Sequence, residues 1–279
     1  MIQFIGALIS GLNLGSIYAL IALGYTMVYG IAKMLNFAHG DIIMVGAYSV
    51  IVSAVTLKLP PVVAILIAVV VCAALGVTIE FLAYRPLRQS PPLAVLITAI
   101  GVSYLLQNLA LLIFGPEQKS TPALFDLPSL TLGVTAAIMV GLTLFINLTR
   151  MGKAMRAVSE DRDAAELMGI SVNKTITITF AIGSALAAVA SVFFGATYTY
   201  IKPTTGSMPG IKAFTAAVFG GIGSIPGAML GGILLGLIEQ LSKVYISTLW
   251  SDAVVFGVLV LVLVFKPAGL LGKRVREKV

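Results

Sequence analysis

Residues 150–174 read RMGKAMRAVSEDRDAAELMGISVNK, the longest polar run in a chain that is otherwise mostly apolar. Hydrophobic segments long enough to cross a bilayer lie on both sides of this run. Charged side chains are costly in hydrocarbon, so the run must lie in water while its neighbours cross the membrane. The contrast predicts a multi-pass membrane protein in which residues 150–174 form a loop outside the bilayer.

The composition supports a membrane protein. Of the 279 residues, 59% are hydrophobic and only 10% are charged, and the mean hydropathy is +1.06. A soluble domain carries about 25% charged residues. At about 20 apolar residues per crossing, we expect an all-α polytopic transmembrane helix bundle with broken or re-entrant helices and about seven to nine crossings. No polar stretch is long enough to fold alone, so residues 1–279 are expected to form a single membrane domain.

Apolar runs and turn signals divide the chain into predicted helices. A single helix over the first run would measure about 45 Å, which exceeds the hydrocarbon core, so it is either tilted or interrupted near Gly11–Gly15. Asn36 is expected to cap the second helix, and Ser251 or Asp252 the last. The predicted spans are residues 2–31, 37–57, 61–84, 93–114, 129–148, 174–201 and 252–271.

A further stretch, residues 209–244, holds two short apolar runs separated by GGIGSIPG at 220–227. Glycine and proline at this density break a helix. The spacings Gly227-xxx-Gly231 and Gly232-xxx-Gly236 allow a neighbouring helix to approach closely. We therefore expect a hairpin of two short helices, or two spans, with the break at its inner tip or at membrane depth.

The charge distribution predicts an orientation. The net charge is +7, and most basic residues fall in the turn 84–92, in residues 150–174 and in the tail 272–279. The positive-inside rule places all three in the cytoplasm and the N-terminus outside. No basic run is interleaved with aromatic residues, so nucleic-acid binding is not expected.

Within the polar run, Ser159 is expected to cap an amphipathic helix, with Glu160, Asp161 and Asp163 in its first turn. Ala164, Ala165, Leu167 and Met168 would form its apolar side. The sequence DAAELMG at 163–169 resembles the EAA-xxx-G loop of bacterial ABC importer permeases. In that family the loop forms a coupling helix that docks on the ATPase subunit.

The rest of the chain strengthens the resemblance. GSIYALIALGYTMVYGIAKMLNFAHGDIIMVGAY at 15–48, EFLAYRPLR at 80–88, AIGVSYLLQN at 99–108, TRMG at 149–152 and GIKAFTAAVFGGIGSIPGAMLGGILLG at 210–236 resemble the LivH-type permease of the branched-chain amino acid ABC importer. The resemblance implies location in the bacterial inner membrane. It also implies three kinds of partner: a second homologous permease, two ATPase subunits and a periplasmic binding protein.

The resemblance also implies a docking surface for the ATPase. The sequence lacks the G-x-x-x-x-G-K-[ST] phosphate loop, so this chain is expected to bind no cofactor and not to be an enzyme, with ATP and Mg²⁺ on the partner subunits. The residues expected to dock the ATPase are Arg156, Glu160, Asp163, Ala164, Ala165 and Gly169.

A path for a zwitterionic amino acid needs hydroxyls or a helix N-terminus, some acceptors and apolar walls, which broken helices supply without a full charge. The candidates are Asn36, His39, Gly221, Gly223, Ser224 and Tyr200. These residues also have structural alternatives. For His39, fixing a helix end is favoured over contact with the substrate. The glycines would allow tight helix packing, and Tyr200 would lie at the membrane interface.

Other functions remain as alternatives. A urea or short-amide importer permease has a similar sequence, and a stand-alone secondary carrier would transport without any ATPase. The carrier is disfavoured because the acidic residues inside spans are few and have ordinary roles; Glu80 lies beside Arg85, and Glu239 precedes Lys243 by one helical turn. A membrane enzyme or a metal site is not expected, because the chain has one histidine and no ligand cluster.

Overall fold

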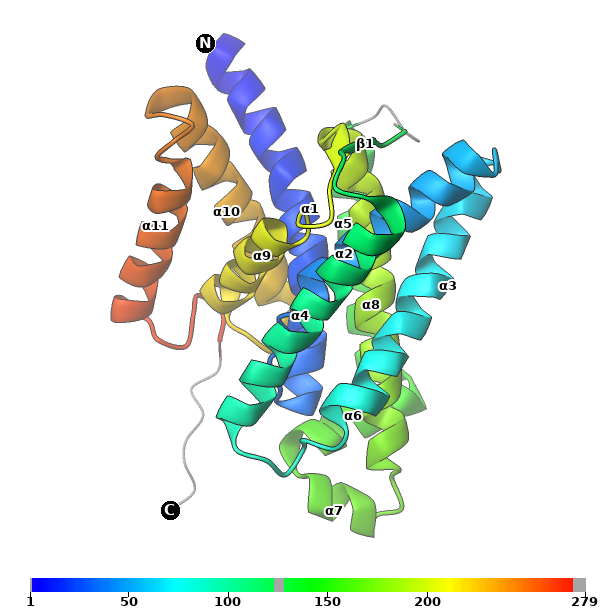
Figure 1. Cartoon of the computed structure of the whole chain (residues 1–279). Helices are drawn as coiled ribbons and strands as arrows, with labels where there is room; N and C mark the ends of the chain where they lie inside the picture. Colours follow the sequence, from blue (N-terminus) through cyan, green and yellow to red (C-terminus); the bar gives the residue numbers. More distant parts are fainter. Residues whose placement is uncertain (1, 123–127, 273–279) are drawn as a thin grey trace.

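A computed structural model describes residues 2–122 and 128–272, which form a bundle of helices (Figure 1). A two-stranded antiparallel sheet pairs Lys119 with Ile201 and Ser120 with Tyr200. Two helices end in π-helical turns, η1 and η2. The elements are α1 Ile2–Ala32, α2 His39–Ile51, η1 Val52–Thr56, α3 Pro61–Ile79, η2 Glu80–Tyr84, α4 Pro92–Phe114, β1 Lys119–Ser120, α5 Pro128–Leu148, α6 Arg150–Glu160, α7 Arg162–Leu167, α8 Val172–Thr197, β2 Tyr200–Ile201, α9 Ser207–Gly220, α10 Ile225–Tyr245 and α11 Ser251–Phe265.

Seven helical segments of the described chain are long and apolar enough to cross a membrane. They contain α1, α2 with η1, α3 with η2, α4, α5, α8 and α10. Helix α11 is apolar but has only 15 residues, about 22 Å, so it is shorter than the hydrocarbon core. The chain is therefore a multi-pass, all-α membrane protein, and the predicted fold class is confirmed.

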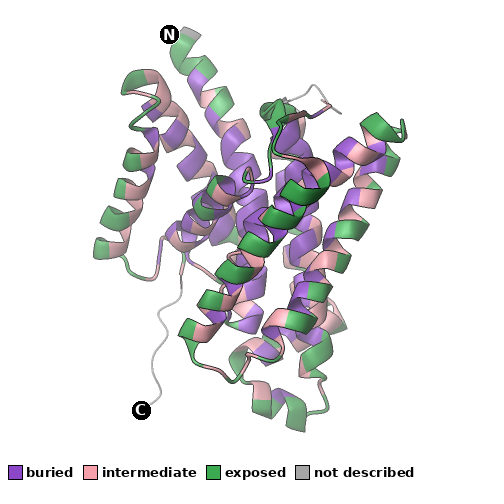
Figure 2. Cartoon of the chain, viewed as in Figure 1, coloured by how far each residue is buried: buried purple, intermediate pink, exposed green. Residues whose placement is uncertain are grey.

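The core lies around α1, α2 and α8, in which more than half of the most apolar window is buried (Figure 2). By contrast, less than a third of the corresponding window is buried in α3, α4 and α5, as expected of helices that face lipid. Helix α1 runs unbroken through the bundle, which resolves the alternatives left open for residues 2–31. At Gly15, a Cβ atom would lie 2.7 Å from Ile233 Cα of α10, so the small-residue spacing serves close helix packing.

The last helix differs from the sequence-based expectation. Its N-cap is Trp250, without a side-chain hydrogen bond; Ser251 begins the helix and Asp252 lies in its first turn. The helix ends at Phe265, and the chain then turns back towards the end of α9. The Leu270 amide donates to Phe219 O at 2.9 Å. The predicted span 252–271 was therefore too long, because the helix ends at Phe265 and Leu270 pairs with the backbone at the end of α9.

The polar segments gather at one end of the bundle. In Figure 1, helices α6 and α7 lie at the bottom, near the α3–α4 turn, and the start of α1 lies at the top. The predicted hairpin is present as α9 and α10, which are separated by residues 221–224. Its break lies beside Gly30, near the lower end of α1. Of the basic tail, residues 273–279 lie outside the described part of the chain.

Candidate functional site

The polar run forms two short helices rather than one. Thr149 caps α6 by accepting a hydrogen bond from Gly152 N at 3.0 Å. The Asp161 carboxylate caps α7 by accepting from the amides of Asp163 and Ala164, both at 3.0 Å. The expected cap at Ser159 is wrong, because its hydroxyl donates to Arg156 O inside α6. Aspartate competes well for this position because its two oxygens can accept from several free amides.

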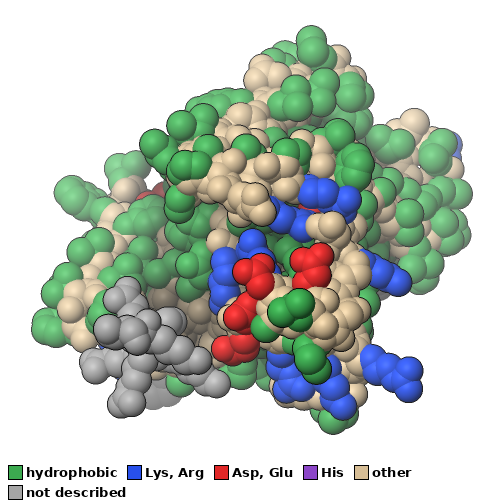
Figure 3. All heavy atoms as spheres, turned by 90° about the horizontal axis from the view of Figure 1, so that it is seen from below, with side chains coloured by type: hydrophobic (Ala, Val, Ile, Leu, Met, Phe, Trp, Pro, Cys, Tyr) green, Lys and Arg blue, Asp and Glu red, His purple; other side chains and the backbone are tan. Residues whose placement is uncertain are grey.

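The α6–α7 pair presents a mixed surface. Of the six residues expected to dock the ATPase, Arg156, Glu160, Asp163, Ala164 and Gly169 are exposed, and only Ala165 is buried. Leu167 and Met168 are 89% and 82% exposed, so the expected apolar side of one helix is divided between the interior and solvent. Figure 3 shows this end of the molecule, where acidic and basic side chains surround exposed hydrophobic ones.

The α6–α7 pair is joined to the central helix. The Arg162 guanidinium in α7 donates to the carbonyl of Ala32, the last residue of α1. That carbonyl is one of the helix-terminal acceptors that lack an intrahelical partner. This bond connects α7 to the end of α1, which contacts α8, α9 and α10.

The first candidate break lies between α1 and α2. Asn36 does not cap α2 with its side chain; instead its Oδ1 accepts from the Tyr84 hydroxyl at 2.9 Å. His39 begins α2 and is buried, with its ring edge-on to Tyr25 at 4.6 Å. The His39 Nε2 atom has no hydrogen-bond partner in the described part of the chain. Asn36 thus connects the break to η2, and His39 packs the start of α2 against α1.

The second candidate break, residues 221–224, is held by backbone geometry. Gly221 and Gly223 have φ of +108° and +93°, a region that favours glycine. Ser224 caps α10 by accepting from Gly227 N at 3.2 Å. Gly223 packs against Gly30 of α1, whereas His39 packs against Gly24 of the same helix. Gly30 lies six residues, or about 9 Å, further along α1 than Gly24. The two breaks therefore contact the same helix at successive levels.

Tyr200 lies apart from both breaks. It belongs to the short strand β2, pairs with Ser120 and is 60% exposed. This strand is at the opposite end of the bundle from α6 and α7 (Figure 1). The sequence-predicted path residues thus fall into two groups beside α1 and one surface residue. Asn36, His39 and Gly221 are buried, Ser224 is half-buried, and Gly223 is exposed.

A buried carboxylate joins α3 to α8. Glu80 is fully buried and binds Arg85 at 3.1 Å, Arg88, and the Thr177 hydroxyl at 2.7 Å. Burial lowers the pKa of the Arg88 guanidinium, and the Glu80 charge opposes that shift. The expected Glu80–Arg85 contact is confirmed. The contacts of Glu80 with Arg88 and Thr177 were missed; Thr177 is 97 positions from Glu80 in the sequence.

A second buried carboxylate joins four helices. Glu239 Oε1 binds Lys243 at 2.6 Å, as expected, and also binds Lys212 of α9 at 2.9 Å. The Tyr18 hydroxyl of α1 donates to Glu239 Oε2 at 2.9 Å, and Lys212 also pairs with Asp252 of α11. Sequence reasoning missed Lys212. The available signal was a lysine within an apolar glycine-rich run, because such a lysine needs a buried partner.

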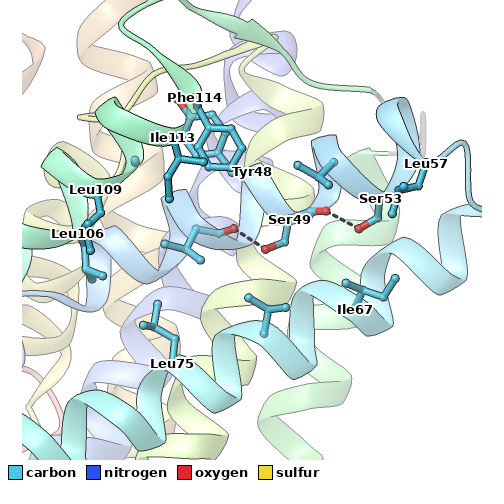
Figure 4. A pocket seen from close by; sticks show the side chains of 14 residues that line it. Tyr48, Ser49, Ser53, Leu57, Ile67, Leu75, Leu106, Leu109, Ile113 and Phe114 are labelled. Carbon is cyan, nitrogen blue, oxygen red and sulfur yellow. Dashed lines mark hydrogen bonds between the residues drawn. The ribbon is translucent and has the colours of Figure 1, made fainter.

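An apolar cavity of about 420 Å³ lies between α2, α3 and α4 (Figure 4). The hydroxyls of Ser49 and Ser53 on its wall already donate to backbone carbonyls one turn earlier. The ring of Tyr48 stacks on Phe114 with centroids 4.1 Å apart. This cavity lacks a charged lining group, so it does not suit a zwitterion.

Comparison with known proteins assigns the chain to a family. Residues 7–263 match the family described as branched-chain amino acid transport system / permease component. The chain belongs to this family. The resemblance that its motifs suggested is therefore confirmed, and the matched residues include the seven long spans except residues 3–6 of the first.

Individual relatives extend over the whole chain. BraD of Pseudomonas aeruginosa, a high-affinity branched-chain amino acid transport system permease protein, is 45% identical, with 99% of this chain and 98% of BraD covered. LivH of Escherichia coli K12, which has the same description, is 45% identical over 100% of this chain and 98% of its own. Among solved structures, PsaBC from Streptococcus pneumoniae in complex with Fab matches with a TM-score of 0.51 at 18% identity, covering 94% of both chains. That likeness concerns the fold alone.

Proposed function

We propose that this chain is the membrane-spanning permease subunit of an ATP-driven importer of branched-chain amino acids. The proposal combines the full-length similarity to two permeases of that description with the α6–α7 pair. This pair exposes Leu167 and Met168 among charged side chains, and Arg162 forms a hydrogen bond with the end of α1. Two exposed apolar side chains rimmed by charges are typical of a protein-binding surface.

The proposed assembly contains a second homologous permease, two ATPase subunits that hold ATP and Mg²⁺, and a periplasmic binding protein. The α6–α7 pair and the C-terminus would face the cytoplasm of the inner membrane, consistent with the basic residues at that end. ATP binding in the ATPase subunits would move α7, and Arg162 would pass the motion to α1. Because both helix breaks pack on α1, this motion would open and close the path between them.

The test compares two highly exposed leucines at opposite ends of the bundle. Leu167→Glu in α7 should abolish co-purification of the ATPase subunits and ATP-dependent uptake of radiolabelled leucine. Leu249→Glu is the control, since Leu249 is 92% exposed in the α10–α11 connection. This variant should keep the ATPase subunits bound.

Full ATPase binding and leucine uptake by the Leu167→Glu variant would refute the docking assignment. Leucine uptake by the purified chain in liposomes without any ATPase subunit would instead indicate a secondary carrier. Uptake of urea or a short amide in preference to leucine would refute the proposed substrate.

A further inference from the structure

A second cavity, of about 320 Å³, lies at the end of the bundle opposite α6 and α7. Its lining comes from the first turns of α1, the end of α8 and the last turns of α10. Its volume is at the lower end of the range for small-molecule sites. We call it the outer cavity. The lining residues that bear on its chemistry are Ile9, Asn13, Leu14, Tyr198, Gln240 and Lys243.

Lys243 is the charged group of this lining. Its ammonium donates to Glu239 at 2.6 Å, but Glu239 is shared with Lys212 and with the Tyr18 hydroxyl. Lys212 also pairs with Asp252, so the network holds two ammonium groups and two carboxylates, and Glu239 is the carboxylate that pairs with Lys243. An ammonium has three donors, and Lys243 uses one of them on Glu239, so it retains hydrogen-bonding capacity for an anion.

Asn13 supplies a complementary acceptor. Its Oδ1 atom is buried and has no hydrogen-bond partner in the described part of the chain. A buried amide oxygen without a partner is costly, so a ligand that brings a donor is favoured there. The apolar side chains of Ile9 and Leu14 line the same cavity. The cavity thus offers a cationic group and an aliphatic wall, and rotation of the Asn13 side chain would turn its buried, unpartnered oxygen towards a ligand.

We propose that the outer cavity is the site at which the permease receives the zwitterionic amino acid. Lys243 binds the carboxylate, Asn13 accepts a hydrogen bond from the ammonium, and Ile9 and Leu14 contact the aliphatic side chain. This inference rests on the proposed function for its substrate and direction of transport. It places the first contact with the substrate at the end that would face the binding protein.

The experiment uses the purified permease in lipid nanodiscs, without its partners. Ser10→Cys places a reporter thiol on the lining of the outer cavity. The native Cys72 is fully buried, so its reaction with a thiol reagent should be slow. Leucine should slow the labelling of Ser10→Cys several-fold. Isoamylamine, which lacks the carboxylate, and isocaproate, which lacks the ammonium, should protect more weakly. A reporter at Lys58→Cys, exposed and outside the cavity, should be unaffected.

Second substitutions in the Ser10→Cys background separate the two contacts. Lys243→Met should raise the half-protecting concentration of leucine about tenfold, because a charge-assisted hydrogen bond is lost. The same change should leave protection by isoamylamine unaltered. Lys243→Arg should retain most of the protection. Asn13→Ala should weaken protection by leucine and isoamylamine but not by isocaproate. The matched control is Lys58→Met.

The inference would be overturned if leucine left the Ser10→Cys labelling rate unchanged, or if Lys243→Met and Lys58→Met had the same effect. It would also fail if isoamylamine and isocaproate each protected as well as leucine. Failure of the proposed function has a different signature, which is absence of ATP-dependent leucine uptake by the wild-type assembly. Labelling of the permease alone reports on the cavity in either case.

Discussion

At the scale of single residues, the buried carboxylates Glu80 and Glu239 are paired with basic side chains, whereas buried Asp41 accepts a hydrogen bond from Gln107. Glu239 is completely buried and Lys212 is nearly so, and their side chains meet at 2.9 Å. Two ionised groups in a nonpolar interior are tolerated because each supplies the other with charge and hydrogen bonds. Removing one partner leaves the other as an uncompensated charge.

Glu239→Ala should therefore destabilise the protein by about 3–5 kcal/mol, since Lys212 and Lys243 both lose their shared carboxylate. The melting temperature in detergent measures this loss. Glu117→Ala is the matched control, because Glu117 is exposed and forms no salt bridge within the described residues. Equal melting temperatures for the two variants would show that the buried network does not stabilise the bundle.

At the scale of helices, close approach of backbones replaces the hydrophobic effect, which cannot drive association of helices already in lipid. Helix α1 meets α10 at Gly11 and Gly15, where a side chain would collide with the partner helix. Glycines on α5 differ: a Cβ atom at Gly133 would meet no atom within 4 Å. The same residue type thus has opposite roles in the two helices.

Gly15→Ala should destabilise the protein by about 1–3 kcal/mol, because the added methyl forces α1 away from α10. Gly133→Ala should leave stability unchanged or raise it by about 1 kcal/mol, since alanine is the better helix former. Thermal unfolding in the same detergent compares the two. A larger loss at Gly133 would contradict the packing described for α1 and α10.

A second prediction at this scale concerns the bond from α7 to α1. Arg162→Ala should keep the ATPase subunits bound but lower the amount of leucine transported per ATP hydrolysed, because the link to Ala32 is lost. Lys153→Ala, an exposed change in α6, should preserve this ratio. An unchanged ratio for Arg162→Ala in reconstituted vesicles would exclude Arg162 as the route of coupling.

At the scale of the whole molecule, the bundle has two unlike ends. The α6–α7 pair and the α3–α4 turn lie at one end, and the start of α1 lies at the other (Figure 1). The outer cavity is lined by the first turns of α1 together with the ends of α8 and α10. Because charged loops do not cross the hydrocarbon easily, we propose an orientation with the α6–α7 end in the cytoplasm.

This orientation predicts opposite accessibility for two engineered thiols. In intact spheroplasts, a membrane-impermeant reagent should label Lys58→Cys but not Arg156→Cys, and in inside-out vesicles the pattern should reverse. Both positions are exposed in the structure, so poor access within the protein does not limit the reaction. The inverse pattern would place α6 and α7 outside and refute the proposed ATPase dock.

Several features of the fold could be predicted from sequence because their signals are local. The glycines and proline of GGIGSIPG at 220–227 predicted a helix break, and the structure has one between Gly220 and Ile225. Helix caps were less predictable: Asn36, Ser159 and Ser251 were all expected to cap, and none does so with its side chain. Each polar side chain had a competing partner: the distant Tyr84 for Asn36, and a carbonyl three residues earlier for Ser159 and Ser251.

The sequence alone determined that this chain crosses a membrane many times, where its longest polar run lies, and which family it resembles. These properties follow from hydropathy and motifs, which are sums over neighbouring residues. Only the tertiary structure decided that residues 150–174 form two helices tied to α1, that Lys212 shares Glu239 with Lys243, and that Asn13 lines the same cavity as Lys243. The contacts to Lys212 and Asn13 join residues on different helices, so they depend on how the helices pack and not on any local pattern.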